Sequence, residues 1–366
     1  MNSRSVLLII ILSVFIGRIN TQAQKVSTNN RLYNEAFDHL AGMLSGEIEI
    51  SLKDAVYQVE NAYLDDNLSY DSFNLSIEYY TNIARLFLEK SELDYMGDDK
   101  ENIRKNGAIF TVMTAKENIY LKDDYYLMPD PFLYDFDDFW GERDWTNMFV
   151  SKLLNTHSGN CHSLPLLYKI LAEELEAKAY LSFAPNHTYI KVRSQNPEIG
   201  WYNTELTSAT FPIDAWIKSS GYVHLDAIKN GIYMDTLSKS QEIVMCMIDL
   251  AKGYERHFKK PDDLDFLVQC ADTALAYYPN YVNAMLLKAE TLKKKFEAIM
   301  DKEGATYASQ VLSIDENKTL FEQMETLYAK IFRMGYRTMP KEMYAEWLSD
   351  LNKHADKYTN KALNID

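Results

Sequence analysis

Residues 158–172 read SGNCHSLPLLYKILA and decide the fold, because they join a tight glycine turn to a strongly patterned helix. Cys161 stands where this helix is predicted to begin. A helix start carries partial positive charge and favours a thiolate, so Cys161 is the candidate nucleophile of the chain. We expect its amide to face a developing oxyanion and Gly159 to leave room for a substrate carbonyl. The apolar stripe of the helix, typical of one buried face, is Leu164, Leu167, Tyr168, Leu171 and Leu175.

After this helix the sequence changes from a helical to an alternating pattern. Apolar side chains alternate with others in residues 179–183, again in 187–192, and a third strand is expected at 201–206. Pro185-Asn186 separates the first two strands and indicates a hairpin. A helix followed by such strands predicts an α+β fold in which the helix packs on a small antiparallel sheet.

Two of these strands carry the partners that a nucleophilic thiol needs. A base must lie within hydrogen-bonding reach of the sulfur, and a third group must orient that base. His187 begins the second strand, and Asn203 and Glu205 lie on one face of the third. Either residue could hold the imidazole ring, so both remain open as the orienting group.

This pattern resembles the transglutaminase-like superfamily of papain-like folds. That family shows Gly-x-Cys at the start of a leucine-rich helix, then a histidine that begins a strand, then a Gly-Trp strand ending in Thr. In this chain the three features are Gly159 with Cys161, His187, and residues 200–207, GWYNTELT. The family's aspartate precedes that Thr by two residues, so the resemblance implies a Cys161–His187–Glu205 triad, with Asn203 as the alternative third residue.

The resemblance also suggests a second oxyanion donor and a layout. Asn155 stands six residues before Cys161, the spacing at which papain-type peptidases carry a glutamine donor. Its other interpretation is a residue of the turn that precedes the glycine. A related subgroup has helices before the papain/transglutaminase-like core and tetratricopeptide-like helices after it, and the layout of this chain is similar.

The chain begins with a signal-peptide pattern. After Arg4, an apolar run of eleven residues spans 6–16, which as a helix would rise about 16 Å, short of the ~30 Å of a bilayer core. We therefore expect export to the periplasm or full secretion, without a stable membrane anchor. The predicted segments are a signal peptide (1–23), a helical region (24–121), the core (122–239) with an acidic aromatic loop (122–145), and tetratricopeptide-like helices (240–366).

Within the helical region, Ser51 and Asp54 resemble a capping pair at a helix start. The loop at 122–145 is rich in aromatic residues and acids, so we predict an ordered segment that forms a rim or a wall of the cleft. In the last region, Pro279 and the small residues Ala274 and Ala289 favour a degenerate helical repeat. An ordinary helical bundle is the other interpretation.

The formal net charge of -15 argues against nucleic acid as a partner. We expect no cofactor and no metal. Asp135–Gly141 places its glycine one position late for a calcium loop, and His157 and His162 lack further ligands for zinc. His224 and His257 are interpreted as surface or capping residues.

Cys246 and Cys270 each lie twelve residues from Phe258, so a helical hairpin would bring them side by side. A disulfide is one interpretation, and packing as small apolar side chains is the other.

Two functions follow from these observations. In the first, Cys161 attacks an amide or ester carbonyl, forms a thioester and passes the acyl group to water or an amine. The substrate would be a peptide, a protein or a cell-wall amide. In the second, the core keeps its cleft without catalysis, and the C-terminal helices bind a partner protein.

Overall fold

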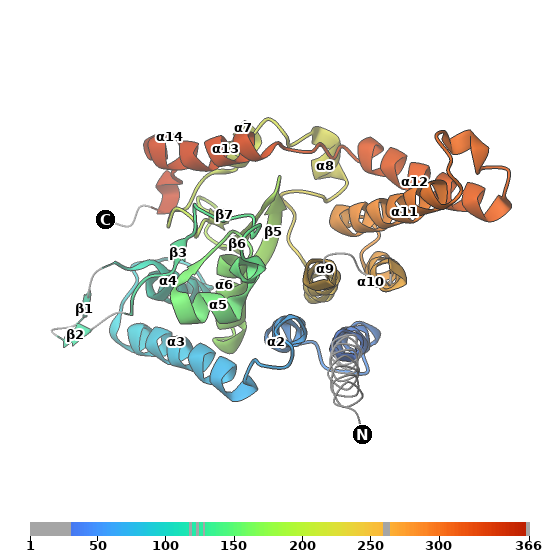
Figure 1. The fold of residues 1–366 in the computed structure, drawn as a ribbon. Helices are drawn as coiled ribbons and strands as arrows, with labels where there is room; N and C mark the ends of the chain where they lie inside the picture. The colour runs from blue at the N-terminus through green and yellow to red at the C-terminus, as the bar shows by residue number, and fades with distance from the viewer. Residues whose placement is uncertain (1–30, 117–118, 122–123, 127–128, 259–263, 364–366) are drawn as a thin grey trace, which may run out of the picture.

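The computed structural model describes residues 31–116, 119–121, 124–126, 129–258 and 264–363. The predicted signal peptide at 1–23 lies outside these residues. Within the described ranges, no helix is both long enough and apolar enough to cross a bilayer. The described chain combines many helices with a small amount of sheet, so its class is α+β (Figure 1).

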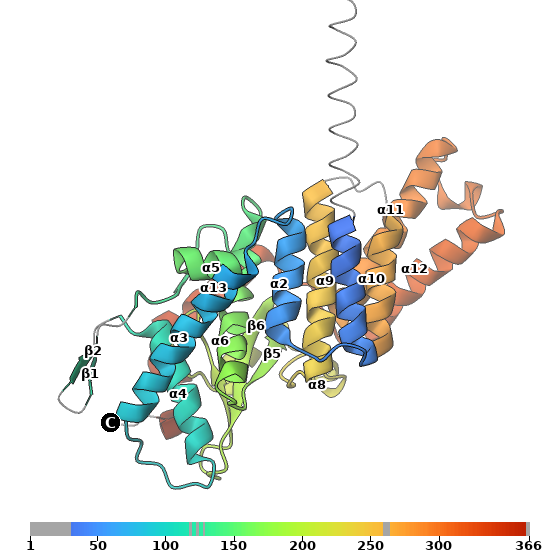
Figure 2. The ribbon, with the colours of Figure 1, turned by 90° about the horizontal axis from the view of Figure 1, so that it is seen from below.

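The N-terminal helices divide between two parts of the molecule. After a helical stretch through 31–45 come α2 (Leu52–Tyr63), α3 (Tyr70–Lys90) and α4 (Lys100–Thr114). Ser51 Oγ accepts the N–H of Asp54 at 3.2 Å, which confirms the predicted cap. Helix α2 lies beside α9 (Lys239–Phe258), whereas α3 and α4 pack on α6 (Ser163–Glu174) (Figure 2). The predicted region 24–121 is therefore not one packing unit.

The central sheet contains β5 (Tyr180–Ala184), β6 (His187–Arg193) and β7 (Trp201–Thr204). They pair antiparallel in the order β5-β6-β7, with Ala184 opposite His187 and Lys191 opposite Asn203. All three predicted strands are thus confirmed. Helix α6 packs across β5 and β6 and buries Leu167 and Leu171 completely. This packing fixes the start of α6 near the start of β6.

The segment predicted as an acidic aromatic loop contains short strands as well. Strand β1 (Ile119–Leu121) pairs with β2 (Asp124–Tyr126), and β3 (Leu133–Tyr134) pairs in parallel with β4 (Ser158–Gly159). The 3₁₀ helix η1 (Trp145–Met148) and α5 (Val150–Thr156) follow before β4. Strands of two or three residues have no readable period, so the sequence pattern could not reveal them. The β3–β4 pair places Tyr134 opposite Gly159, next to the nucleophile turn.

The C-terminal region forms an array of helices and then returns to the sheet. Helices α9, α10 (Leu264–Tyr277), α11 (Val282–Lys302) and α12 (Asp315–Arg333) lie side by side in chain order (Figure 2), with η2 (Ala308–Gln310) before α12. Tyr33 and Phe37, from the first helical stretch, contact Phe266 of α10. The array is therefore completed by N-terminal helices, and its packing does not follow the predicted boundaries.

The last helices cover the sheet instead of extending the array. Figure 1 shows α13 (Lys341–Lys353) and α14 (Ala355–Tyr358) with α7 (Asp214–Ser219) along one side of β5–β7, and α8 (Leu225–Lys229) beyond them. The N–H of Ile213 donates to Tyr358 O at 2.8 Å, and the N–H of Asn360, just before η3 (Lys361–Leu363), donates to Phe211 O at 2.8 Å. Tyr344 and Trp347 of α13 are buried in the core. We call residues 339–360 the C-terminal strap.

Candidate active site

The nucleophile turn is held by two reciprocal hydrogen bonds. Asn160 Oδ1 accepts the N–H of Ser163 at 3.2 Å, and Ser163 Oγ accepts the N–H of Asn160 at 3.0 Å. This arrangement caps the start of a helix. Helix α6 begins at Ser163, so Cys161 lies in the turn before the helix, where the N–H of Leu164 already bonds to Asn160 O at 3.1 Å. Among the described residues, none accepts a hydrogen bond from the Cys161 amide.

Gly159 leaves room for the Ser163 side chain of this cap. The sequence had instead predicted that Gly159 leaves room for a substrate carbonyl. A Cβ at position 159 would lie 2.3 Å from Ser163 Oγ and 2.9 Å from Leu153 Cδ1. Gly159 itself is buried. A side chain here would displace the serine that caps α6, so the space beside Gly159 is occupied by the protein's own atoms.

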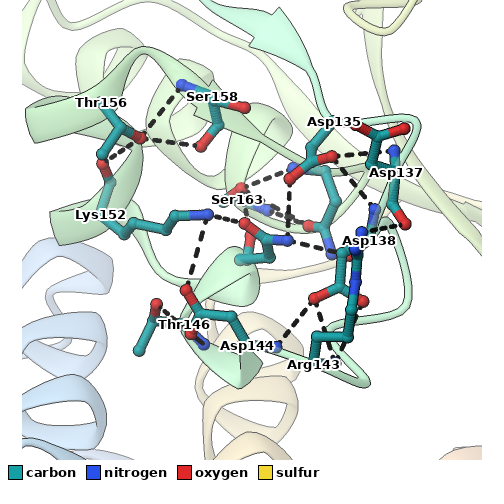
Figure 3. Close-up of polar contacts among 12 residues, drawn as sticks. Asp135, Asp137, Asp138, Arg143, Asp144, Thr146, Lys152, Thr156, Ser158 and Ser163 are labelled. Atoms are coloured by element: carbon teal, nitrogen blue, oxygen red, sulfur yellow. Dashed lines mark hydrogen bonds and ion pairs between the residues drawn. The ribbon is translucent and has the colours of Figure 1, made fainter.

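The acidic loop supports the same turn (Figure 3). Asp135 Oδ1 accepts the N–H groups of Asp137 and Asp138, and the Asp138 carboxylate accepts those of residues 142–144. Asn147 Nδ2 donates to Asp135 Oδ2 at 3.0 Å, while its carbonyl accepts from Ser163 Oγ at 3.0 Å. The carboxylates are therefore engaged in ordering a loop that contacts α6. No described residues form a metal-binding cluster.

His187 lies between a carboxylate and the nucleophile. Its Nε2 is 2.7 Å from Glu205 Oε2, and the two side chains are 0% and 1% exposed. Burial lowers the pKa of the imidazole, but the charge of Glu205 and hydrogen bonds to Cys161 and Glu205 outweigh burial and raise it to about 10. His187 is therefore protonated at neutral pH.

Cys161 and His187 line the same cleft, and each shifts the pKa of the other. Glu205 occupies Nε2 of the imidazole, and Nδ1 lies on the opposite side of the ring, 3.1 Å from the hydroxyl of Tyr344. Burial raises the pKa of the Cys161 thiol, but the hydrogen bond and the positive charge of His187 lower it below its usual value. The side chain still retains partial exposure, and Sγ lies 3.7 Å from Asn186 O. The site therefore favours a thiolate–imidazolium pair.

Two tyrosines on the nucleophile side were not predicted as site residues. The hydroxyl of Tyr344, from α13, is 3.1 Å from His187 Nδ1 and 3.3 Å from the hydroxyl of Tyr134. The Tyr344 hydroxyl also lowers the pKa of the Cys161 thiol. The C-terminal strap thus supplies a hydroxyl to the centre of the site.

Aromatic rings fix the plane of the imidazole. Trp216 and Trp347 stack on each other with ring centroids 4.4 Å apart, and each stands at 90° to the His187 ring at 5.9 and 5.5 Å. Trp347 Nε1 donates to Trp216 O at 3.0 Å. Edge-to-face contacts of this kind restrict rotation of a ring in a packed interior. His187 is therefore held in one orientation toward Glu205.

Of the two candidates for the third residue, Glu205 reaches His187. Asn203 Nδ2 instead donates to Pro212 O at 3.0 Å and to Asp214 Oδ1 at 2.9 Å. Asn155 lies on the exposed side of α5 and does not line the cleft around Cys161. Its position does not suit the predicted oxyanion role, because the turn of α5 directs it to solvent.

The remaining histidines have separate partners. His157 Nε2 is 2.8 Å from Tyr80 OH, and His162 Nε2 is 3.0 Å from Asp249 Oδ2, so the two histidines do not share a ligand-binding position. Of the two, only His162 lines the cleft that holds Cys161. His224 accepts the N–H of Asp226 at the start of α8, which confirms the predicted capping role. His257 lies 3.4 Å from Asp65.

Cys161 and His187 open onto a cleft of about 210 Å³ between the core and the helical array. The core contributes the aromatic loop, with Phe139 and Trp140, and the end of β5. The other wall comes from residues far along the chain, namely Ile232, Tyr233, Met245, Asp249, Lys252, Tyr278, Asn280, Tyr281, Val282, Asn283 and Tyr336. The predicted wall at 122–145 is thus present, and α9, α11 and the turn between α10 and α11 provide most of the facing wall.

One buried donor in this cleft has no partner among the described residues. Trp140 Nε1 is buried, and no described residue accepts its hydrogen bond. The Trp140 ring lies 5.2 Å from the Tyr344 ring, on the side of the cleft that holds Cys161. A buried N–H without an acceptor is costly, so it marks a position where a ligand oxygen could bind.

Cys246 and Cys270 are free and buried within α9 and α10. The disulfide interpretation is therefore wrong, and the packing interpretation holds. Burial raises the pKa of both thiols.

Comparisons with known proteins add little to this geometry. No protein-family model matches the chain, and no curated protein matches it. A crystal structure of menin, described as revealing the binding site for the Mixed Lineage Leukemia (MLL) protein, is similar at 11% identity. The match covers 89% of this chain and 87% of menin with a TM-score of 0.28, a likeness too distant to carry an argument.

Proposed function

We propose that this protein is a cysteine-dependent acyl hydrolase or acyltransferase that acts on amides or esters. One observation carries the proposal: the buried imidazole of His187 lies 2.7 Å from Glu205 and shares a cleft with Cys161, whose pKa it lowers. A thiol, a base and an orienting carboxylate in this order are the parts that nucleophilic catalysis requires.

The proposed reaction uses the thiolate–imidazolium pair. Cys161 Sγ attacks the carbonyl carbon, and the electron pair of the C=O bond moves to oxygen. The oxyanion is stabilised by the Cys161 amide and by Trp140 Nε1, the two donors near the sulfur that have no described acceptor. When the tetrahedral intermediate collapses, the carbon–nitrogen or carbon–oxygen bond breaks and His187 gives its proton to the leaving group.

The thioester is then consumed in the same way. His187, now neutral, takes a proton from water or from an amine as that nucleophile attacks the thioester carbonyl. Collapse of the second intermediate releases the Cys161 thiolate and restores the imidazolium. Glu205 does not exchange protons in this scheme, because its role is to orient the ring and stabilise its positive charge.

The wider assignments stay proposals of the same kind. We propose a papain/transglutaminase-like core, supported by α6 packed on β5 and β6 of the three-stranded sheet and by the chain order of Cys161, His187 and Glu205. We also propose export, supported by the apolar run at 6–16. Tetratricopeptide-like character is supported only by the side-by-side packing of α9 to α12.

A second function, a non-catalytic binding module, is favoured by one observation. Tyr344 lies 3.1 Å from the His187 nitrogen that must serve the nucleophile, and it could compete for that nitrogen. In this alternative, the cleft between the core and α9–α11 receives a partner protein without acyl transfer.

The acyl-enzyme distinguishes the two functions. We would treat the full chain with p-nitrophenyl acetate and follow p-nitrophenolate release and intact protein mass. An acyl hydrolase gives an acetyl thioester on Cys161 that decays with turnover, and Cys161→Ala abolishes both signals. Asn203→Ala should retain them, since Asn203 does not contact His187. Acetylation of lysines alone, equal in Cys161→Ala, would overturn the catalytic proposal.

A further inference from the structure

The charged groups of the cleft are paired, with one exception. His162 forms an ion pair with Asp249 at 3.0 Å, and His187 is paired with Glu205. Lys252, on α9, lines the same cleft. Its ammonium group makes no ion pair and no hydrogen bond with any residue in the described part of the chain. Lys252 is therefore a cation in the cleft without a counter-ion.

The position of Lys252 places it near the nucleophile without touching the triad. Lys252 follows Asp249 by three residues on α9, so their side chains are neighbours on one helix face. Asp249 contacts His162, the residue next to Cys161. Lys252 also acts electrostatically on His162. Lys252 therefore shares the cleft with Cys161 and lies near the His162–Asp249 pair, outside the Cys161–His187–Glu205 group.

The local charges favour an anion at this position. Burial lowers the pKa of His162, but the charge and hydrogen bond of Asp249 raise it, so Asp249 is neutralised by its partner. Lys252 is only half-buried, in a cleft whose other lining is largely aromatic. The chain has a net charge of -15, which disfavours anions in general. A cation without a partner is therefore the position in the cleft where an anionic group is attracted most strongly.

We propose that Lys252 binds a carboxylate of the acyl substrate, several bonds away from the carbonyl that Cys161 attacks. This inference rests on the proposed function. The substrates would be amides or esters of acidic compounds, in which the carboxylate is either the C-terminus of a peptide or an acidic side chain.

Matched alkylating probes separate these sources. Cys161 thiolate displaces bromide from a bromoacetyl group and forms a carbon–sulfur bond. Bromoacetyl-glycine and its amide differ by a terminal carboxylate, whereas bromoacetyl-aspartic α-amide and bromoacetyl-asparagine amide differ by a side-chain carboxylate. The quantity measured is the ratio of the second-order rates of the anionic and neutral probes of each pair, determined on the full chain at low ionic strength.

In Lys252→Gln this ratio should fall about threefold to fivefold for at least one pair, the size expected of a partly exposed ion pair. The pair that responds identifies the source of the carboxylate. Lys252→Arg should restore the ratio. Lys288→Gln removes the same charge from a lysine paired with Asp272 on the helical array and should leave the ratio unchanged. Because each ratio is normalised to a neutral probe, partial misfolding does not imitate the result.

Two results would overturn the inference alone: an unchanged ratio for both pairs in Lys252→Gln, or an equal fall in Lys288→Gln, which would indicate a long-range charge effect. In both cases Cys161 still reacts and the proposed function stands. If Cys161 of the wild-type chain reacts with no probe faster than a free cysteine does, the proposed function fails and this inference fails with it.

Discussion

The three cysteines lie in two different regions of the molecule: Cys161 in the candidate site, and Cys246 and Cys270 in the helical array. Cys161 lies in a turn before α6 and faces His187, and its pKa is lowered although burial opposes this. Cys246 and Cys270 lie inside the helical array, where burial raises their pKa without a cationic partner to offset it. Burial raises the pKa of all three thiols, so it is the neighbouring imidazolium that distinguishes Cys161 from the two packing cysteines.

The largest expected effect is the difference in alkylation between these regions. At pH 6 and limiting iodoacetamide, Cys161 should react more than a hundredfold faster than Cys246 or Cys270, since each unit of pKa changes the thiolate fraction tenfold. Intact mass and peptide mapping would show one modified site in the folded chain and three after denaturation. Early modification of Cys246 or Cys270 in the folded chain would contradict the comparison.

Removal of His187 should leave the burial of Cys161 without its main offset. In the wild-type chain the lowered pKa keeps the thiolate present as pH falls, whereas in His187→Ala the thiolate should form only above a pH of about 8.5. The alkylation rate at pH 6 should therefore fall about a hundredfold.

Glu205→Gln should lower the alkylation rate of Cys161 at pH 6 about tenfold. The imidazolium of His187 loses its counter-ion in this variant, but the ring remains. Asn203→Ala is the matched control on the same strand. A larger loss in Asn203→Ala than in Glu205→Gln would reverse the assignment of the third residue.

A smaller effect is expected from the hydroxyl of Tyr344. Tyr344→Phe keeps the ring in the aromatic cluster but removes the hydrogen bonds to His187 and Cys161. The pH midpoint for alkylation should rise, and the rate at pH 6 should fall about threefold to tenfold. Tyr358→Phe, a hydroxyl deletion elsewhere in the C-terminal strap, should leave the pH profile unchanged. An unshifted midpoint in Tyr344→Phe would show that the strap does not tune the thiol.

The smallest effects belong to the two packing cysteines. Cys246→Ala and Cys270→Ala should each lower the free energy of unfolding by about 1 kcal/mol, since a buried sulfur is removed without a polar loss. Urea denaturation measures this change. The alkylation of Cys161 should be the same in both variants, and a changed rate would mean that the array is coupled to the nucleophile.

Much of the nucleophile region was readable because its signals are local. Patterns that repeat over a few neighbouring residues indicate the apolar stripe of α6, the hairpin at Pro185-Asn186 and the strand that begins at His187. Glu205 was readable as one of two candidates on one strand face. The choice between Glu205 and Asn203 required the packing of α7, because Asp214 at its start engages Asn203.

Other site residues had weaker signals or none. Trp140 belongs to the aromatic loop that was expected to form a cleft wall, yet nothing in that loop singled out its indole N–H. Tyr344 lies 157 residues from His187, and the sequence of α13 gives no indication of which surface it covers. Asn155 had a suggestive spacing, but the orientation of α5 turns it outward.

By itself, the sequence determined where the thiol, the base and the orienting carboxylate stand along the chain, and which helix and strands carry them, because hydrophobic periodicity acts over neighbouring residues. Only the tertiary structure decided that the C-terminal strap brings Tyr344 to His187 and that α9, α11 and the turn between α10 and α11 face Cys161 across a cleft. Those contacts join residues far apart in the chain, and the burial of apolar faces that creates them leaves no trace of its partner in the local sequence.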